Sequence, residues 1–234
     1  MKRVFDASKF TKLPDVIFFD LDNTLYSYDK ANMAGMSALE QKFLDKLKIS
    51  KPVFKKSFLE ARTQVKRLLI GQAGSHSRLL YIKRMLENLG LGSQITLSLE
   101  LEQTYWGAFL YETHLYPQVT DLLDELRLMS IPTAIITNLT TQIQFRKILY
   151  LGLEGYFDFV ITSEEAGHEK PHISPFILAK DKISNSASNI WMVGDDLESD
   201  INGSKKAIGA TTILMAKIST LKKQTNLDAL DAVV

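Results

Sequence analysis

The sequence predicts an α/β protein with a doubly wound parallel sheet and an inserted all-helical unit. Five short apolar runs of strand length alternate with helix-like segments, which is typical of parallel βαβ units. Three of these runs end directly in acidic or other polar side chains. The long region after the first run contains no convincing strand, only amphipathic helices.

The elements of the core follow from the spacing of apolar residues. A run of four to six apolar residues bounded by polar ones has the length of a buried strand. Apolar residues three and four positions apart indicate helices between the runs. Val16–Phe19, Thr133–Ile136, Phe157–Thr162, Ile190–Val193 and Ala210–Met215 are the expected strands, and Val119–Met129, Gln142–Leu149, Pro175–Lys182 and Ile201–Ile208 the expected helices. Leu227–Val234 is a candidate for either a last strand or a tail.

The helical insert is expected over residues 27–114, so that 1–26 and 115–234 form the α/β core. The insert carries 13 Lys and Arg against 8 Asp and Glu, which gives +5, and the remainder carries 15 against 19, which gives −4. Two interpretations are open: an ordinary solvated surface, or a basic lid that attracts an anionic substrate to an acidic core. Its four expected helices are Ala38–Leu47, Val53–Leu69, Arg78–Leu89 and Leu97–Leu110.

Composition excludes several classes of protein. The net charge of the 234-residue chain is +1, so neither a nucleic acid polymer nor a membrane is an expected partner. The chain has no cysteine, which rules out disulfide scaffolds, thiolate metal sites and cysteine nucleophiles. No apolar segment is long enough for a membrane span. We expect a cytoplasmic protein, and both monomer and homodimer stay open.

The most informative motif is the acid pair Asp20 and Asp22, which follows the first expected strand and precedes Thr24. Two carboxylates at a strand end require compensation, and a hard cation with oxygen ligands provides it. Asp20 could act as a nucleophile toward phosphorus, and Asp22 could exchange a proton with a leaving group. The alternative is an Asx-turn or a pair of helix caps, since Asp is common where strands end.

Three further signals follow other expected strands. Thr137 and Asn138 begin a helix, where a hydroxyl and free backbone N–H groups can bind an anion, although both are also ordinary helix caps. Lys170 precedes a proline in a loop, where it could screen a phosphate and a carboxylate or simply be solvated. Four acids between Asp195 and Asp200 either bind a cation such as Mg²⁺ or form a solvated loop. A doubly wound sheet would bring all these strand ends to one edge.

These motifs resemble those of the haloacid dehalogenase superfamily of hydrolases. The stretch Asp20-Leu21-Asp22-Asn23-Thr24 matches its first motif, Thr137-Asn138 its second, Lys170-Pro171 its third, and Gly194-Asp195 with Asp200 its fourth. The match covers roughly residues 14–26 and 115–216, and the helical insert lies where this superfamily places its helical cap. The resemblance therefore implies a Rossmann-like core with a cap.

The resemblance also implies a role for each motif residue. Asp20 would be the nucleophile that forms an aspartyl-phosphate. Asp22 would be the general acid and base and would give its backbone carbonyl to Mg²⁺. Asp20 and Asp195 would be side-chain ligands of the metal, and Asp200 would support its water molecules. The residues holding the transferred phosphoryl group would be Thr137, Asn138 and Lys170.

The same resemblance distinguishes phosphatases from dehalogenases. The dehalogenases lack the second acid and the metal, whereas this chain has Asp22 and the acidic cluster, which favours phosphoryl transfer. The motifs are most similar to the branch that contains nucleoside-monophosphate and acylneuraminate-phosphate phosphatases. Asp196 departs from the pattern, because many relatives have Ser or Thr there.

Substrate choice is expected to depend on the insert. In residues 71–78, glycines and small polar residues surround His76 and Arg78, and an arginine suits a second phosphate or a carboxylate. The alternative is an ordinary turn between helices. Tyr105 and Trp106 could stack on a base, but aromatic residues on an amphipathic helix are more often part of a core.

The sequence thus favours a magnesium-dependent phosphomonoester hydrolase that acts on a small phosphorylated metabolite, either a nucleotide or a sugar phosphate. One alternative is a phosphomutase, which uses the same aspartyl-phosphate but returns the phosphoryl group to the product. Another is a non-catalytic binding or regulatory module on the same fold. Retention of both Asp20 and Asp22 argues against the last one.

Overall fold

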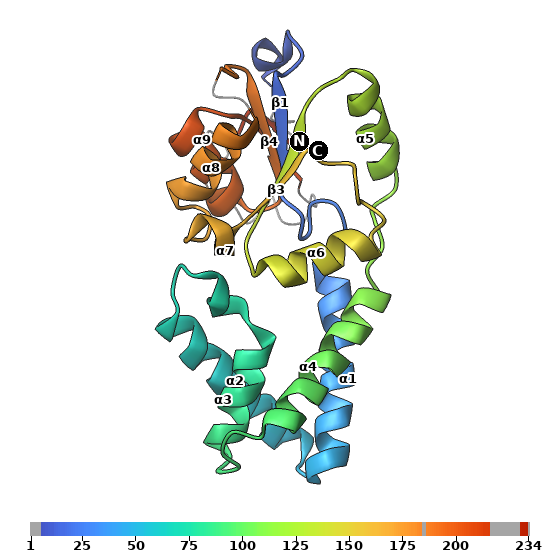
Figure 1. Ribbon diagram of the computed structural model, residues 1–234, viewed down its shortest axis with the longest axis vertical. Coiled ribbons are helices and arrows are strands. Elements are labelled where there is room, and N and C mark those ends of the chain that lie inside the picture. Colours follow the sequence, from blue (N-terminus) through green and yellow to red (C-terminus); the bar gives the residue numbers. More distant parts are fainter. Residues whose placement is uncertain (1–5, 184–185, 216–229, 234) are drawn as a thin grey trace.

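A computed structural model describes residues 6–183, 186–215 and 230–233. Within them, six strands pair in parallel into one sheet with the order β3-β2-β1-β4-β5-β6 (Figure 1). This confirms the predicted doubly wound class. The strands are β1 (Val16–Phe19), β2 (Thr133–Thr137), β3 (Phe159–Thr162), β4 (Ile190–Gly194), β5 (Thr211–Leu214) and β6 (Ala232–Val233). Within the candidate last strand, residues 227–229 and 234 lie outside the described residues, as do 216–226.

Helices cover both faces of the sheet. Helices α5 (Val119–Leu128) and α6 (Thr141–Tyr150) lie on one side, and α8 (Ile173–Ile183) and α9 (Gly203–Ile208) on the other (Figure 1). Successive side chains of a strand point to opposite faces, so β1 contributes to two separate cores. Both cores are apolar because a parallel sheet is buried on its two faces. Ile17 and Phe19 belong to one cluster, and Val16 and Phe18 to the other.

The inserted region folds into four helices beyond the edge of the sheet where β1 ends (Figure 1). Helix α1 packs along α4, and α2 along α3. Their apolar core is continuous with the cluster on one face of the sheet. We call this unit the cap; its predicted limits at residues 27 and 114 stay a prediction. The helices are α1 (Tyr28–Leu47), α2 (Lys51–Leu68), α3 (Arg78–Asn88) and α4 (Ile95–Tyr111).

The first cap helix begins at Tyr28, so the expectation that it begins at Ala38 was wrong. The hydroxyl of Ser27 accepts a hydrogen bond from the backbone N–H of Lys30 and caps the helix. The buried residues in the first half of α1 are small, Ala31 and Gly35, so they give little apolar signal, and Gly35 lies close to Tyr105 of α4. Among the described residues, no helix has both the length and the apolar character needed to span a membrane.

Two elements near the sheet edge were not expected from the sequence. A short helix, α7 (Ser163–Ala166), directly follows β3, where a loop was expected. A π-helical turn, η3 (Leu197–Asn202), precedes α9, so the helix expected over residues 201–208 is split. The side chain of Asp196 accepts hydrogen bonds from the N–H groups of Glu198 and Ser199 and thereby starts this turn.

The contact between α1 and α4 leads to a stability prediction. A Cβ atom at Gly35 would lie 2.8 Å from the Tyr105 ring and 2.9 Å from its carbonyl oxygen. We expect Gly35→Ala to lower the free energy of unfolding by about 1–3 kcal/mol through overpacking. Gly107→Ala in α4 is the matched control, because a Cβ there meets open space. That change should stabilise the helix by roughly 0.5–1 kcal/mol. Equal effects of the two variants in urea unfolding would contradict this account.

Candidate active site

Lys170 lies at the centre of the polar groups that follow the strands. Its Nζ is 2.7 Å from Oδ1 of Asp20, 2.7 Å from Oδ1 of Asp200 and 2.6 Å from the carbonyl oxygen of Ile136. The three contacts use the three donors of an ammonium group. Burial by itself lowers the pKa of Lys170, but the two carboxylates outweigh burial and raise the pKa above its ordinary value. Lys170 is therefore a fixed, fully paired cation.

Asp20 is held at both oxygens. Lys170 bonds Oδ1, and the hydroxyl of Thr24 donates to Oδ2 over 3.0 Å. The side chain is buried, and its backbone N–H donates to Val193 of the neighbouring strand β4. Burial is the main cause that raises the pKa of Asp20 to about 7, with Lys170 acting in the opposite direction. The carboxylate is thus oriented by the protein before any substrate arrives.

Three carboxylates converge beside Lys170. Asp20, Asp195 and Asp200 each offer an oxygen, and these atoms lie within 4.8 Å of one another. Burial, followed by repulsion from the other two carboxylates, raises the pKa of Asp195 to about 8. Three carboxylates and one ammonium leave two negative charges, which a divalent cation would neutralise. An all-oxygen donor set of this charge fits Mg²⁺.

Glycine and the π-helical turn allow this convergence. A Cβ at Gly194 would lie 2.4 Å from the side chain of Asp200, so only glycine admits this approach. The second oxygen of Asp200 accepts from the N–H of Asp196 over 3.1 Å. Asp196, the departure from the expected motif, therefore shapes the turn that holds Asp200 against Lys170.

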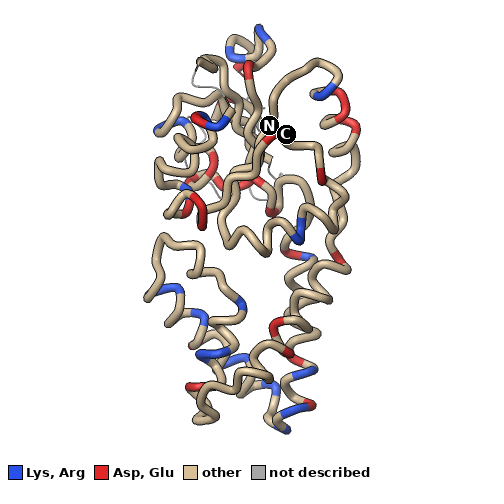
Figure 2. Tube along the Cα trace, viewed as in Figure 1, with Lys and Arg blue, Asp and Glu red and all other residues tan. Residues whose placement is uncertain are grey.

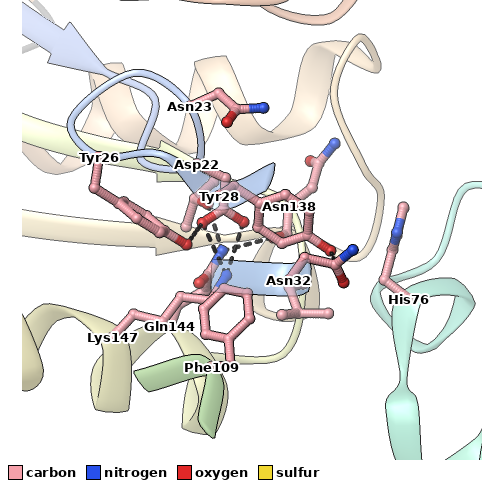
Figure 3. A network of polar contacts seen from close by, with 12 residues as sticks. Asp22, Asn23, Tyr26, Tyr28, Asn32, His76, Phe109, Asn138, Gln144 and Lys147 are labelled. Atoms are coloured by element: carbon pink, nitrogen blue, oxygen red, sulfur yellow. Dashed lines mark hydrogen bonds and ion pairs between the residues drawn. The ribbon is translucent and has the colours of Figure 1, made fainter. Parts of the chain in front are cut away.

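The side chain of Asp22 lies outside the group of three carboxylates. It pairs with Lys147 of α6, whose Nζ is 2.8 Å and 2.7 Å from its two oxygens, and it accepts a hydrogen bond from the hydroxyl of Tyr26 (Figure 3). Burial lowers the pKa of Lys147, although the charge of Asp22 acts to raise it. Lys147 also lies 5.4 Å from the ring centre of Phe109.

Sequence reasoning did not identify Lys147. The sequence nevertheless contains an indication, because Lys147 is a charged residue on the apolar face of an expected helix, four positions after Ile143 and beside Ile148. Gln144 lies on the same face, and neither Lys147 nor Gln144 is exposed to solvent. Long polar side chains buried on a helix face need partners. Gln144 has its partners nearby in the sequence, whereas the partner of Lys147 is Asp22, which is distant in the sequence.

The predicted phosphate-binding residues at the end of β2 contact one another and the Lys170 loop. Gln144 donates to the hydroxyl of Thr137 over 2.6 Å and to the carbonyl oxygen of Asn138 over 2.7 Å. The side-chain oxygen of Asn138 accepts from the backbone N–H of Lys170 over 2.8 Å, and its amide donates to the carbonyl oxygen of that residue over 3.3 Å. Asn138 thus holds the loop that presents Lys170.

The cap contacts the core through the predicted specificity segment. Glu169 accepts a hydrogen bond from Ser75 over 2.9 Å and lies 3.1 Å from Nε2 of His76. The backbone N–H of Glu169 also donates to Gly71. Arg78 is buried in the cap and donates to the backbone oxygen of His76. His76 therefore contacts a carboxylate of the core, whereas Arg78 is buried within the cap and bonds a neutral backbone oxygen.

A cavity of about 260 Å³ separates the cap from the strand ends. Tyr105 and Trp106 are both buried, as expected for core aromatics, but Trp106 also contributes to the cavity wall. The wall combines core residues with basic and aromatic residues of the cap: Asp22, Tyr28, Arg62, Lys66, His76, Arg78, Tyr81, Trp106, Asn138 and Leu139.

Comparison with known proteins gives consistent results. The model of the haloacid dehalogenase-like hydrolase family matches residues 14–207. The chain is 44% identical to a ribulose-1,5-bisphosphate 5-phosphatase of Halopiger xanaduensis, over 85% of this chain and 83% of that protein. It is 30% identical to a pyrimidine 5'-nucleotidase of Escherichia coli, over 86% of each chain.

The fold is also found among solved structures. A 2-haloacid dehalogenase of Pseudomonas syringae superposes with a TM-score of 0.76 at 24% identity, over 95% of this chain and 94% of that one. The family model and the phosphatase relatives confirm the prediction of a phosphatase that was made from the motifs. The chain belongs to the haloacid dehalogenase-like hydrolase family.

Proposed function

We propose that the chain is a magnesium-dependent phosphomonoester hydrolase that acts on a small sugar phosphate through an aspartyl-phosphate on Asp20. The observation that carries this proposal is the state of Asp20, a buried carboxylate oriented by Lys170 and Thr24 at the carboxyl end of a strand. Asp22 lies two residues away, in the wall of the cavity beneath the cap. The proposed proton-transfer group thus borders a cavity that offers space for a substrate, two residues along the chain from the proposed nucleophile.

A sugar phosphate is favoured over a nucleotide by the comparison with known proteins. The relative with 44% identity is a phosphatase of a phosphorylated sugar, whereas the pyrimidine nucleotidase is 30% identical.

In the first step, a carboxylate oxygen of Asp20 attacks phosphorus in line and the bond to the leaving oxygen breaks. Asp22 gives its proton to that oxygen, and the aspartyl-phosphate remains. In the second step, Asp22 takes a proton from water, and the resulting hydroxide attacks phosphorus and frees Asp20. Lys170 balances negative charge beside Asp20, and Thr137 and Asn138 would orient the phosphoryl group.

The metal would be held by the side chains of Asp20 and Asp195 and by the backbone carbonyl of Asp22, with Asp200 supporting its water ligands. The ion supplies positive charge that reduces repulsion between the substrate phosphate and the carboxylate of Asp20. Neither the phosphomutase nor the non-catalytic alternative is favoured by a specific contact among the described residues.

The nucleophile leads to a first activity prediction. Asp20→Asn should lower kcat for phosphate release from p-nitrophenyl phosphate by about 10³-fold or more, because the amide cannot form the acyl phosphate. Asp45→Asn, the same chemical change at an exposed carboxylate of α1 that accepts hydrogen bonds from Gln41, is the control. Full activity of Asp20→Asn would disprove the assignment. Wild-type release of free phosphate without added bisphosphate would favour a hydrolase over a phosphomutase.

We also propose that Lys147 is a positioning residue that holds Asp22. Lys147→Met keeps a long side chain in the same space but leaves Asp22 with Tyr26 as its hydrogen-bond partner. Proton transfer matters most for poor leaving groups, so kcat should fall about tenfold or more for an alkyl phosphate and less for p-nitrophenyl phosphate. Lys182→Met, which removes an exposed partner of Glu165, is the control. An equal loss for both substrates would indicate a purely structural role.

Proton binding at the carboxylates predicts pH-dependent stabilisation by Mg²⁺. The pKa values of about 7 for Asp20 and about 8 for Asp195 are above those of unfolded chains, so these groups hold more protons in the folded state. Their contribution to stability is therefore lost as pH rises toward 8. Mg²⁺ requires the ionised groups and should raise Tm more at pH 8 than at pH 6.

Thermal unfolding with Mg²⁺ or with a chelator tests this. Asp195→Asn should weaken the effect of Mg²⁺ at pH 8, since one carboxylate ligand is lost. A shift of Tm by Mg²⁺ that is the same at both pH values, or that survives unchanged in Asp195→Asn, would contradict the assigned metal site.

A further inference from the structure

The cavity beneath the cap has two walls of opposite chemical character. Asp22 and Asn138 come from the core side, where the phosphoryl group would react. Arg62 and Lys66 of α2 and Arg78 of α3 come from the cap side. Figure 2 shows Lys and Arg along the cap helices, and Asp and Glu on the part of the core that faces them.

Arg78 is a buried cation with neutral partners. It is 9% exposed, and its guanidinium donates to the hydroxyl of Tyr28 and to the backbone oxygen of His76. Aromatic rings surround the guanidinium, with the ring centre of Tyr105 at 5.1 Å and that of Trp106 at 5.8 Å. Within the described part of the chain, no carboxylate lies within ion-pair distance of Arg78. A buried charge in this state is costly unless an anion compensates it.

Arg62 and Lys66 add positive charge to the same wall. They are four residues apart on α2, so both side chains lie on one face, where like charges destabilise a helix. Neither lies within ion-pair distance of a carboxylate among the residues that the structure describes. The pKa of Lys66 is lowered by burial and then by the charge of Arg62, whereas the charge of Glu169 acts to raise it.

The acids nearest to this wall are already paired. Lys147 bonds both oxygens of Asp22, and Glu169 is engaged by Ser75 and His76. The cap wall therefore presents three cations to a cavity that holds no free carboxylate to balance them. A carboxylate ligand would bring one negative charge and a phosphate up to two, so a phosphate matches this wall better.

We propose that Arg62, Lys66 and Arg78 bind a second phosphate of the substrate, so that the enzyme prefers a small sugar bisphosphate to the corresponding monophosphate. This inference rests on the proposed phosphatase function. It deepens that function by assigning the residues that recognise the non-reacting end of the substrate. Arg78 would form the buried base of this phosphate site, and Arg62 and Lys66 its more accessible rim.

The test compares ribulose 1,5-bisphosphate with ribulose 5-phosphate, which differ only in one phosphate. Wild-type kcat/KM should be at least about tenfold higher for the bisphosphate, because charged hydrogen bonds to the second phosphate are lost with the monophosphate. Arg62→Gln and Lys66→Gln should each reduce this ratio several-fold, mostly through KM, and the double variant should bring it close to one. Arg67→Gln, the neighbouring cation of α2 outside the cavity wall, should keep the wild-type ratio.

A third substrate, 3-phosphoglycerate, tests phosphate against carboxylate. If wild-type kcat/KM for it equals that for the bisphosphate, the assignment of a phosphate site is wrong. An unchanged ratio in the Arg62→Gln, Lys66→Gln double variant would also overturn the proposal.

Binding separates this proposal from the hydrolase itself. Calorimetry on Asp20→Asn should show tighter binding of ribulose 1,5-bisphosphate than of ribulose 5-phosphate, and the double variant in this background should lose the difference. If the wild-type protein hydrolyses neither these substrates nor p-nitrophenyl phosphate, the proposed function is wrong. The difference in binding between the two ribulose phosphates would still test whether the cap binds a second phosphate. No difference in binding would overturn it.

Discussion

The bridge from Lys170 to Asp20 and Asp200 is the constraint on which the rest of the site depends. One ammonium group bonds two carboxylates and the carbonyl oxygen of Ile136 in β2. It therefore joins β2 to the segments that follow β1 and β4, its neighbours in the sheet. A buried lysine is tolerated here because all three N–H groups donate hydrogen bonds and because two carboxylates lie close to the ammonium charge. Asn138 fixes the backbone of Lys170 from outside, and the Gly194 position leaves space for Asp200. Loss of the Lys170 ammonium group would leave the buried carboxylates of Asp20 and Asp200 without their cation.

The two acids of the first motif have separate electrostatic environments. Asp20 shares Lys170 with Asp200, and burial is the main cause of its raised pKa, to which the charges of Asp200 and Asp22 add. Asp22 instead has a lysine of its own, Lys147, and a tyrosine hydroxyl. Two carboxylates with different partners can take different roles in a reaction. Lys147 connects this difference to the cap, since the aromatic rings near it come from α1 and α4.

The sequence predicted the strands, the helical insert and the residues that converge at the sheet edge, because these are local patterns: short apolar runs, helical spacing and polar residues directly after strands. It did not predict partners that are distant in the sequence. Lys147 contacts Asp22 only because α6 packs beside the end of β1. Arg62 and Lys66 line the cavity only because α2 lies opposite the core. The start of α1 was missed for a similar reason, since the fit of Gly35 against Tyr105 is a tertiary contact.

Charge balance relates the two halves of the molecule. The core edge has two negative charges beyond Lys170, which a divalent cation would cancel, and the cap wall has three positive charges with no carboxylate to pair them. The contact between His76 of the cap and Glu169 of the core is partly exposed, so it adds little to the attraction between the two units. A doubly phosphorylated ligand would supply the missing negative charge at the cap and a phosphoryl group at the core. Such a ligand would contact the cap and the core at the same time, so it would stabilise their contact more than a ligand with a single phosphate.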